Sequence, residues 1–506
     1  MSAITHGAYL DHRASRGDDL DHRRLLDGPF WRDVYAYRDV DEATFGDHAW
    51  QARNAVTSVA ELRAALGPRV SPALLDDIER GMRLATMSVR VTPYLLSLIR
   101  WDEAHEDPLR AQFFPLASRM LPDHPLVTLD SLHEQHDAVT PGLVHRYADK
   151  VLFLSTSTCP VYCRFCTRSY AVGIDTPRVE KVRLRLRDDR WQRAFDYIAA
   201  TPTVEDVLVS GGDVWQLRAA QITEIGDALL AIPHVRRVRL ASRGLVASPQ
   251  KILTDAPFTD AITRLVERGR KLHKEVALHA HFNHPREITA TTQRATDLLM
   301  ERGVYLRAQT VLQRGVNDDA DVMTALVKRL AYVNAHAYYV YVHDLVRGVE
   351  DLRTSLDTAL RIEKRVRGST AGFNTPVFVV DAPGGGGKRD AHSFEHYDRE
   401  TGVSVFVAPS VKPGQRFLYV DPLHSLAPEQ QRRWDDPAER DRMVRDALEA
   451  PSPALPRDAG EGGEALSPSL PREAGRAVRP SPRPSPAKRG GCPLVAGMPS
   501  PRPLPA

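Results

Sequence analysis

The sequence predicts an α/β fold built on a partial (β/α)6 barrel, and three observations carry this prediction. From residue 151 onward, short apolar segments alternate with amphipathic helical segments, which is typical of a parallel sheet. Six such strand–helix units occur. Polar motifs follow the predicted strands, where a parallel barrel carries its chemistry. Before this region the pattern is helical.

Composition limits the class of protein. A chain of 506 residues has room for two or three domains and a sizeable core. The formal net charge of +3 is small and the charges are mixed, so we expect neither a nucleic-acid nor a membrane partner. The sequence shows no apolar signal segment and no run approaching the ~20 apolar residues of a membrane span. Clustered cysteines fit a reducing, cytoplasmic setting.

The amino-terminal part is expected to be helical. Residues 1–28 are polar and predict a disordered segment, and residues 29–140 predict a helical domain. Ser58 and Glu61 form a capping box ahead of an apolar helical pattern. Ser71 and Pro72 similarly predict an N-cap and first turn.

The barrel is expected over residues 141–373. We expect strands at 151–154, 206–209, 236–240, 275–279, 305–312 and 337–342, with helices at 222–232, 258–273, 291–302 and 321–333. A further segment, 374–426, begins with a strand that runs into a glycine loop. Residues 427–506 become rich in Pro, Arg and Ser and predict a disordered tail, which holds Cys492.

Three of the four cysteines fall close together, immediately after the first barrel strand. Cys159, Cys163 and Cys166 have the spacing C-x3-C-x2-C. Clustered thiolates outside a disulfide context indicate an iron or other soft-metal site. Three ligands leave one coordination position open for chemistry. The alternative is three inert, buried thiols.

A second chemical motif is Pro383-Gly384-Gly385-Gly386-Gly387-Lys388. A P-loop fits poorly because the spacing fails and Arg389 stands where a hydroxyl is needed. A flexible linker is the plainer alternative, but linkers rarely open from a β-branched strand. Glycines permit close approach of a ligand to the backbone, and a lysine there can form a Schiff base with pyridoxal 5′-phosphate (PLP).

Histidines and other polar residues follow several strands. His279, His281 and His284 could indicate zinc, but no matching carboxylate set accompanies them. Packing and hydrogen bonding are therefore the preferred roles. Other polar residues at strand ends or on strands are Ser210, Gly211, Gly212, Asp213 and Gln309.

The cysteine spacing resembles that of the radical S-adenosylmethionine (SAM) enzymes. Residues 162–168 resemble the lysine 2,3-aminomutase family more closely, with Phe165 where the family has His. The run from Pro383 to Lys388 resembles that family's PLP-lysine motif. The resemblance extends over residues 50–423.

This resemblance implies three cofactors and their ligands. Cys159, Cys163 and Cys166 would hold a [4Fe–4S] cluster whose remaining iron binds SAM, and Lys388 would bind PLP. Arg146 and Tyr147 would hold the PLP phosphate, although a structural Arg–Tyr pair remains an alternative. The residues implied near SAM are Gln309, His281, Ser210, Gly211, Gly212 and Asp213.

Charge also points to the substrate. Asp344 and Asp381 each follow or end a strand, and two carboxylates in one pocket repel unless a cation lies between them. The family binds a lysine side chain in this way, and a glutamate-specific branch replaces the aspartates. Arg168 would bind the substrate carboxylate. Strand-end capping and a structural arginine are the plainer alternatives.

The resemblance therefore implies an isomerase that moves the α-amino group of L-lysine to the β-carbon, giving β-lysine. In this chemistry hydrogen passes between the substrate and the 5′ carbon of SAM, and a flavodoxin or ferredoxin would donate the electron. Arginine or another cationic amino acid is the rival substrate, because Arg347 adds positive charge nearby. A catalytically silent iron–sulfur scaffold is the rival class. A homo-oligomer is one of the assembly states left open.

Overall fold

Ten strands form one sheet in chain order, from β1 at one edge to β10 at the other. The computed structural model describes residues 20–182 and 188–452. The strands are β1 (Ala138–Thr140), β2 (Leu143–Tyr147), β3 (Lys150–Thr156), β4 (Asp206–Gly211), β5 (Arg237–Ser242), β6 (Glu275–His281), β7 (Tyr305–Val311), β8 (His336–Tyr341), β9 (Val377–Ala382) and β10 (Gly387–Asp390).

The middle of the sheet is parallel, as predicted, but it is longer by one strand. Strands β3 to β9 pair in parallel, and β9 joins β8 in the register Tyr339↔Val377. The sequence placed residues 377–380 outside the six-strand barrel. Their pairing with β8 makes the glycine-loop segment part of the same sheet, because β10 then folds back antiparallel on β9.

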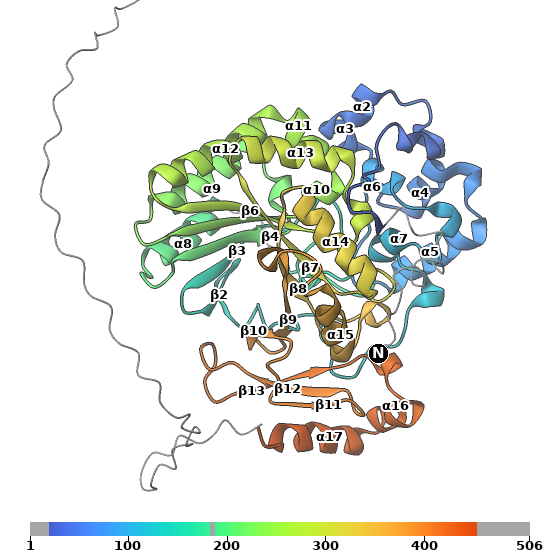
Figure 1. Cartoon of the computed structure of the whole chain (residues 1–506), viewed down its shortest axis with the longest axis vertical. Coiled ribbons are helices and arrows are strands. Elements are labelled where there is room, and N and C mark those ends of the chain that lie inside the picture. The colour runs from blue at the N-terminus through green and yellow to red at the C-terminus, as the bar shows by residue number, and fades with distance from the viewer. Residues whose placement is uncertain (1–19, 183–187, 453–506) are drawn as a thin grey trace, which may run out of the picture. The chain divides into compact units, whose positions relative to one another are not determined.

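Helices cover the outside of the strands, as Figure 1 shows. They are α8 (Asp188–Ala199), α9 (Ala219–Ala231), α12 (Ala256–Lys271), α13 (Ala290–Glu301), α14 (Ala320–Tyr332) and α15 (Leu356–Val366). The short helices α10 (Gly244–Ala247) and α11 (Gln250–Thr254) both contact α13. The predicted helices begin a little earlier than expected because Asp255, Thr289 and Asp319 supply N-caps to α12, α13 and α14. Apolar faces of these helices meet the strands in one large core.

Further helices precede the sheet in the chain. They are α2 (Glu42–Gly46), α3 (His48–Arg53), α4 (Val59–Leu66), α5 (Pro72–Leu84), α6 (Pro93–Ser97) and α7 (Pro108–Phe113). The capping box of Ser58 with Glu61 and the N-cap at Ser71 are both present, as predicted. The expected disorder of residues 1–28 is wrong for the described part: Arg329 donates to the Arg24 carbonyl, and Ala290 N–H donates to the Leu26 carbonyl. Residues 1–19 lie outside the described residues.

A small sheet and two helices follow β10. Strands β11 (His396–Asp398), β12 (Val403–Val407) and β13 (Arg416–Val420) pair antiparallel. Helix α17 (Pro437–Glu449) lies against all three strands, and α16 (Pro428–Asp435) contacts α17. The expected disorder from residue 427 is therefore wrong up to residue 449. Trp434 is fully buried and donates to the Thr401 carbonyl, which anchors α16. The rest of the predicted tail, with Cys492, lies outside the described residues.

The curvature of the sheet brings its two ends together. The backbone N–H of Lys388 on β10 donates to the Tyr147 hydroxyl at the end of β2, at 3.0 Å. The helical, barrel and glycine-loop segments belong to one compact unit over the described residues 20–182 and 188–452. None of the helices in the described ranges combines the length and apolar character needed to cross a membrane.

Candidate active site

One cavity of about 610 Å³ brings together the predicted site residues. It is lined by residues along the barrel strands β3 to β8, from Lys150 and Asp206 at their amino ends to Tyr341 at a carboxyl end, and by the cysteine segment, Asp381 and Lys388. The predicted residues that line it are Cys159, Cys163, Cys166, Arg168, Arg146, Tyr147, Ser210, Gly211, Gly212, Asp213, His281, Gln309, Asp344, Asp381 and Lys388. The cysteine motif at 159–166 and the glycine–lysine motif at 383–388 are more than 200 positions apart in the chain, yet both contribute residues to this cavity.

The cysteine segment is held by the glycines after β4. The N–H of Gly212 donates to the Thr156 carbonyl at 2.6 Å, and the N–H of Asp213 donates to that of Thr158 at 2.9 Å. A Cβ on Gly211 would lie 2.3 Å from the Thr156 oxygen, and one on Gly212 would lie 2.2 Å from that of Thr158. Only glycine permits this close approach, which fixes the backbone just before Cys159.

The three thiols are free and partly buried. Burial raises the pKa of each, to about 12 for Cys163, so metal binding rather than the protein environment would favour the thiolate form. No three His, Cys, Asp or Glu side chains in the described ranges converge on a single ion. A [4Fe–4S] cluster does not require that convergence, because each thiolate binds its own iron. The donor set therefore fits such a cluster.

Asp213 is engaged by the protein itself. Its carboxylate accepts from the backbone N–H groups of Trp215 at 2.8 Å and Arg243 at 2.6 Å. Ser210 contributes its carbonyl to the Ser155 hydroxyl. These contacts fix the ends of β4 and β5 beside the cysteine segment. Contact of either side chain with SAM remains a prediction.

His281 and Gln309 lie deeper in the wall. His281 Nε2 is 2.9 Å from Asn283 Oδ1, and burial lowers its pKa to about 3, so the ring is neutral. Gln309 accepts from the Tyr338 hydroxyl at 3.0 Å. Phe165 packs its ring edgewise against His281, with centroids 5.7 Å apart, and thereby closes this part of the wall.

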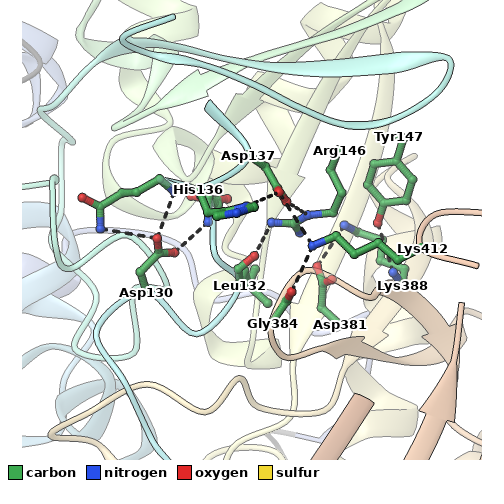
Figure 2. Close-up of polar contacts among 12 residues, drawn as sticks. Asp130, Leu132, His136, Asp137, Arg146, Tyr147, Asp381, Gly384, Lys388 and Lys412 are labelled. Carbon is green, nitrogen blue, oxygen red and sulfur yellow. Dashed lines mark hydrogen bonds and ion pairs between the residues drawn. The ribbon is translucent and has the colours of Figure 1, made fainter. Parts of the chain in front are cut away.

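Lys388 lies opposite Asp381 in the β9–β10 hairpin (Figure 2). Its ammonium Nζ is 3.0 Å from Asp381 Oδ2. Burial lowers the pKa of Lys388, but the Asp381 carboxylate and nearby tyrosines outweigh it and raise the pKa well above the ordinary value. Lys388 must therefore lose a proton from Nζ before it can react with an aldehyde.

The loop before Lys388 passes close to other groups. Gly387 has φ +76°, and a Cβ there would lie 2.6 Å from the Tyr147 hydroxyl. A side chain would break the contact between Tyr147 and the N–H of Lys388. The loop thus forms a side-chain-free cradle next to the reactive lysine, which suits a planar ligand such as PLP.

Two carboxylate oxygens in this cavity have no hydrogen-bond partner within the described ranges: Asp344 Oδ1 and Asp381 Oδ1. The second oxygen of Asp344 accepts from Thr167 at 2.9 Å. Burial, followed by repulsion from Asp381, raises the pKa of Asp344 to about 7. A ligand that donates from a cationic group would satisfy both orphan oxygens.

Arg168 has a partner that the sequence analysis missed. Glu134 accepts from its Nε and Nη2 at 2.9 and 2.8 Å, and Glu134 also accepts from the Tyr170 hydroxyl at 3.0 Å. Arg146 is likewise held, by Asp137 at 2.7 Å. Glu134 and Asp137 are too far along the chain from Arg168 and Arg146 for helix or strand periodicity to relate them. No local sequence pattern therefore predicts these two ion pairs.

Arg347, which raised the possibility of a different substrate, lies elsewhere. It is exposed, its backbone bonds Thr128 and Thr86, and it does not line the cavity within the described residues. Its charge does not bear directly on Asp344 or Asp381.

The partial barrel, the cysteine triad and the partly buried Lys388 define an enzyme cavity for a soft-metal centre and an aldehyde cofactor. The chain is 40% identical over 355 residues to an L-lysine 2,3-aminomutase of Clostridium subterminale, covering 70% of this chain and 79% of that protein. It is 34% identical to the L-lysine 2,3-aminomutase of Bacillus subtilis, over 71% of each chain. A glutamate 2,3-aminomutase of Clostridioides difficile is 31% identical, over 69% of this chain and 76% of that protein.

The chain belongs to the lysine 2,3-aminomutase family. No family model matches it. A solved radical SAM methyltransferase from Sphaerobacter thermophilus aligns over 47% of this chain and 68% of its own, at 18% identity and a TM-score of 0.30, too distant to add to the assignment. Membership makes the protein an isomerase and implies a [4Fe–4S] cluster, SAM and PLP as cofactors. The free cysteines and the glycine cradle beside Lys388 fit these groups.

Proposed function

We propose that the protein isomerises L-lysine to β-lysine. One observation carries this proposal: the cysteine triad, Lys388 and the two orphan oxygens of Asp344 and Asp381 all face one cavity. Metal ligands and an aldehyde-binding lysine supply the chemistry, and paired carboxylates select a cationic side chain.

The residues have distinct roles in this proposal. Cys159, Cys163 and Cys166 hold the cluster and so place SAM, while Lys388 holds PLP with help from Arg146. When bound, these cofactors supply hydrogen abstraction and an electron sink for amino-group migration. The protein contributes binding, orientation and the exclusion of competing hydrogen donors.

The substrate spans the cavity between two charged ends. Arg168 binds the carboxylate with the donors that Glu134 leaves unused, since Glu134 takes only Nε and one N–H of Nη2. The side-chain ammonium lies between Asp344 and Asp381. The Lys388 ammonium pairs with Asp381, so it must leave Asp381 as the substrate ammonium arrives.

A basic side chain is favoured over an acidic one. Glutamate would bring a third carboxylate to Asp344 and Asp381, which repel each other already. Arginine is the remaining rival, because a guanidinium can also bridge two carboxylates. We further propose a cytoplasmic enzyme that takes its electron from a flavodoxin or ferredoxin, since the substrate is a small metabolite and the cluster needs a reducing compartment.

The test is anaerobic reconstitution with iron, sulfide, PLP, SAM and reductant, followed by amino-acid profiling. β-Lysine is expected from lysine, with arginine and glutamate unchanged. Isomerisation of arginine without isomerisation of lysine would overturn the assignment of lysine as the substrate. A Lys388→Ala variant should lose the absorbance of the lysine-bound cofactor near ~420 nm. Retention of that band would place PLP elsewhere.

A further inference from the structure

A charge cluster of Asp137, Arg146 and Lys412 lies against the glycine loop, and Figure 2 shows it beside Lys388. Asp137 accepts from Arg146 Nε at 2.7 Å, and its other oxygen is 3.7 Å from Lys412 Nζ. Lys412 also donates to the Gly384 carbonyl at 3.2 Å. The cluster therefore joins the residue before β1, strand β2, the glycine loop and the connection between β12 and β13.

The glycine loop is shaped to lie on this cluster. Gly385 has φ +89°, and a Cβ there would lie 2.6 Å from Lys412 Nζ and 3.1 Å from Asp137 Oδ2. The positive φ favours glycine at this position, and a side chain there would displace the Lys412 ammonium from the loop. The position of the loop that ends at Lys388 is thus coupled to the position of the cluster.

Arg146 is anchored at one end and available at the other. Its Nε binds Asp137 and its Nη2 donates to the Leu132 carbonyl. Within residues 20–182 and 188–452, its Nη1 makes no hydrogen bond to protein, and the residue lines the cavity. The side chains of Arg146 and Asp137 are only 7% and 9% exposed, so the guanidinium has little freedom to turn.

The cluster places a second cation next to Arg146. Arg146 and Lys412 share the carboxylate of Asp137. Burial lowers the pKa of Arg146, and the carboxylates of Asp381, Asp137 and Glu134 raise it, so Lys412 offsets part of the negative charge around the guanidinium. Lys412 is not one of the described residues that line the cavity, so its effect must pass through Asp137 and the loop. A second cation close to an available guanidinium end suits a phosphate group.

We infer that Asp137 and Lys412 are positioning residues for the phosphate of PLP: Asp137 fixes Arg146 in place, and Lys412 adds positive charge beside this pair. The inference rests on the proposed function, because it takes Lys388 as the PLP lysine and Arg146 as a phosphate ligand. It adds that the small carboxyl-terminal sheet, through Lys412, is part of the cofactor site.

The experiment measures the affinity of the full-length chain, freed of PLP, for PLP and for pyridoxal, which lacks the phosphate. Absorbance of the lysine-bound cofactor reports both. Lys412→Met should weaken PLP binding about tenfold and pyridoxal binding less than about twofold. Lys412→Arg, which keeps the positive charge, should retain most of the PLP affinity that Lys412→Met loses. An equal loss for both ligands, or no loss, would overturn the role of Lys412.

The Asp137→Asn variant distinguishes a role of Asp137 in positioning Arg146 from a purely electrostatic effect of its charge on phosphate binding. Removing a negative charge would by itself strengthen phosphate binding. Positioning predicts the opposite, because Arg146 loses its ionic anchor: PLP affinity falls about tenfold and pyridoxal affinity stays within about twofold. Tighter PLP binding would overturn the role of Asp137.

Lys251→Met is the matched control. Lys251 Nζ is 3.8 Å from Asp255 and donates to the Trp215 carbonyl, and its side chain is 15% exposed against 22% for Lys412. Its loss should not change the ratio of PLP to pyridoxal affinity. That ratio is measured without amino-acid turnover, so an inactive but PLP-selective protein would contradict the proposed function and leave this inference standing.

Discussion

Individual charges in the cavity wall are balanced by specific partners. Lys388 pairs with Asp381, and Arg168 pairs with Glu134. Asp344 forms no ion pair within the described residues, and burial and Asp381 raise its pKa to about 7. It is thus a group in the cavity whose charge changes near neutral pH, and only its deprotonated form attracts a cation.

The first prediction concerns this titration. Below pH about 7 Asp344 is neutral, so the KM for lysine should fall as pH rises through that value. In Asp381→Asn the repulsion is removed, and the inflection should shift to lower pH while lysine binds about tenfold more weakly. KM profiles of both proteins check this. Inhibition by norleucine, whose side chain is uncharged, is the control and should show no inflection. An unshifted inflection in Asp381→Asn would contradict the coupling.

Glu134 supports a second prediction. Its side chain is 4% exposed, and that of Arg168 is 23% exposed. Removing one partner of a buried pair leaves an uncompensated charge, so Glu134→Gln should lower the free energy of unfolding by about 3 kcal/mol. Tyr170→Phe, which removes only one hydrogen bond to the same carboxylate, should cost about 1 kcal/mol. Denaturant unfolding measures both, and equal losses would argue against the ionic role of Glu134.

Among the elements, the turn after β4 controls the cysteine segment. Gly212→Ala places a Cβ against the Thr158 carbonyl, at 2.2 Å before relaxation, so the backbone ahead of Cys159 must move. We expect a loss of about 1–3 kcal/mol of stability and a reduced iron content after reconstitution. Gly372→Ala is the control, since nothing lies within 4 Å of its Cβ position and its φ is ordinary. Full iron loading of Gly212→Ala would contradict the role of the turn.

The elements also show what sequence patterns could predict. Apolar segments that alternate with helical segments predict parallel strands, whose carboxyl ends lie at one edge of the sheet. The sequence therefore predicts that the cysteine segment and Asp344 lie on the same side of the sheet, and both line the cavity. The pairing of β9 with β8 was missed because short strands carry no signal of their partner. Helices α16 and α17 were missed because their sequences are strongly polar, and burial of Trp434 and Met443 becomes visible only in the fold.

At the scale of the whole molecule, the cavity is assembled from distant segments. The sequence motifs provide the chemically reactive groups, whereas their supporting partners come from long-range packing. Glu134 lies 34 positions from Arg168, and Lys412 lies 28 positions from Gly384. No periodicity relates such pairs, because the curved sheet and the carboxyl-terminal sheet decide which side chains meet.

The shared cavity is tested most directly by following hydrogen between its two halves. The reconstituted protein is given unlabelled L-lysine and SAM deuterated at the 5′ carbon. If the cysteine triad and Lys388 serve one reaction space, deuterium appears in the β-lysine formed, because the SAM carbon and the PLP-bound amino acid must be in contact. β-Lysine without deuterium, or no β-lysine from protein fully loaded with cluster and PLP, would contradict a shared active site.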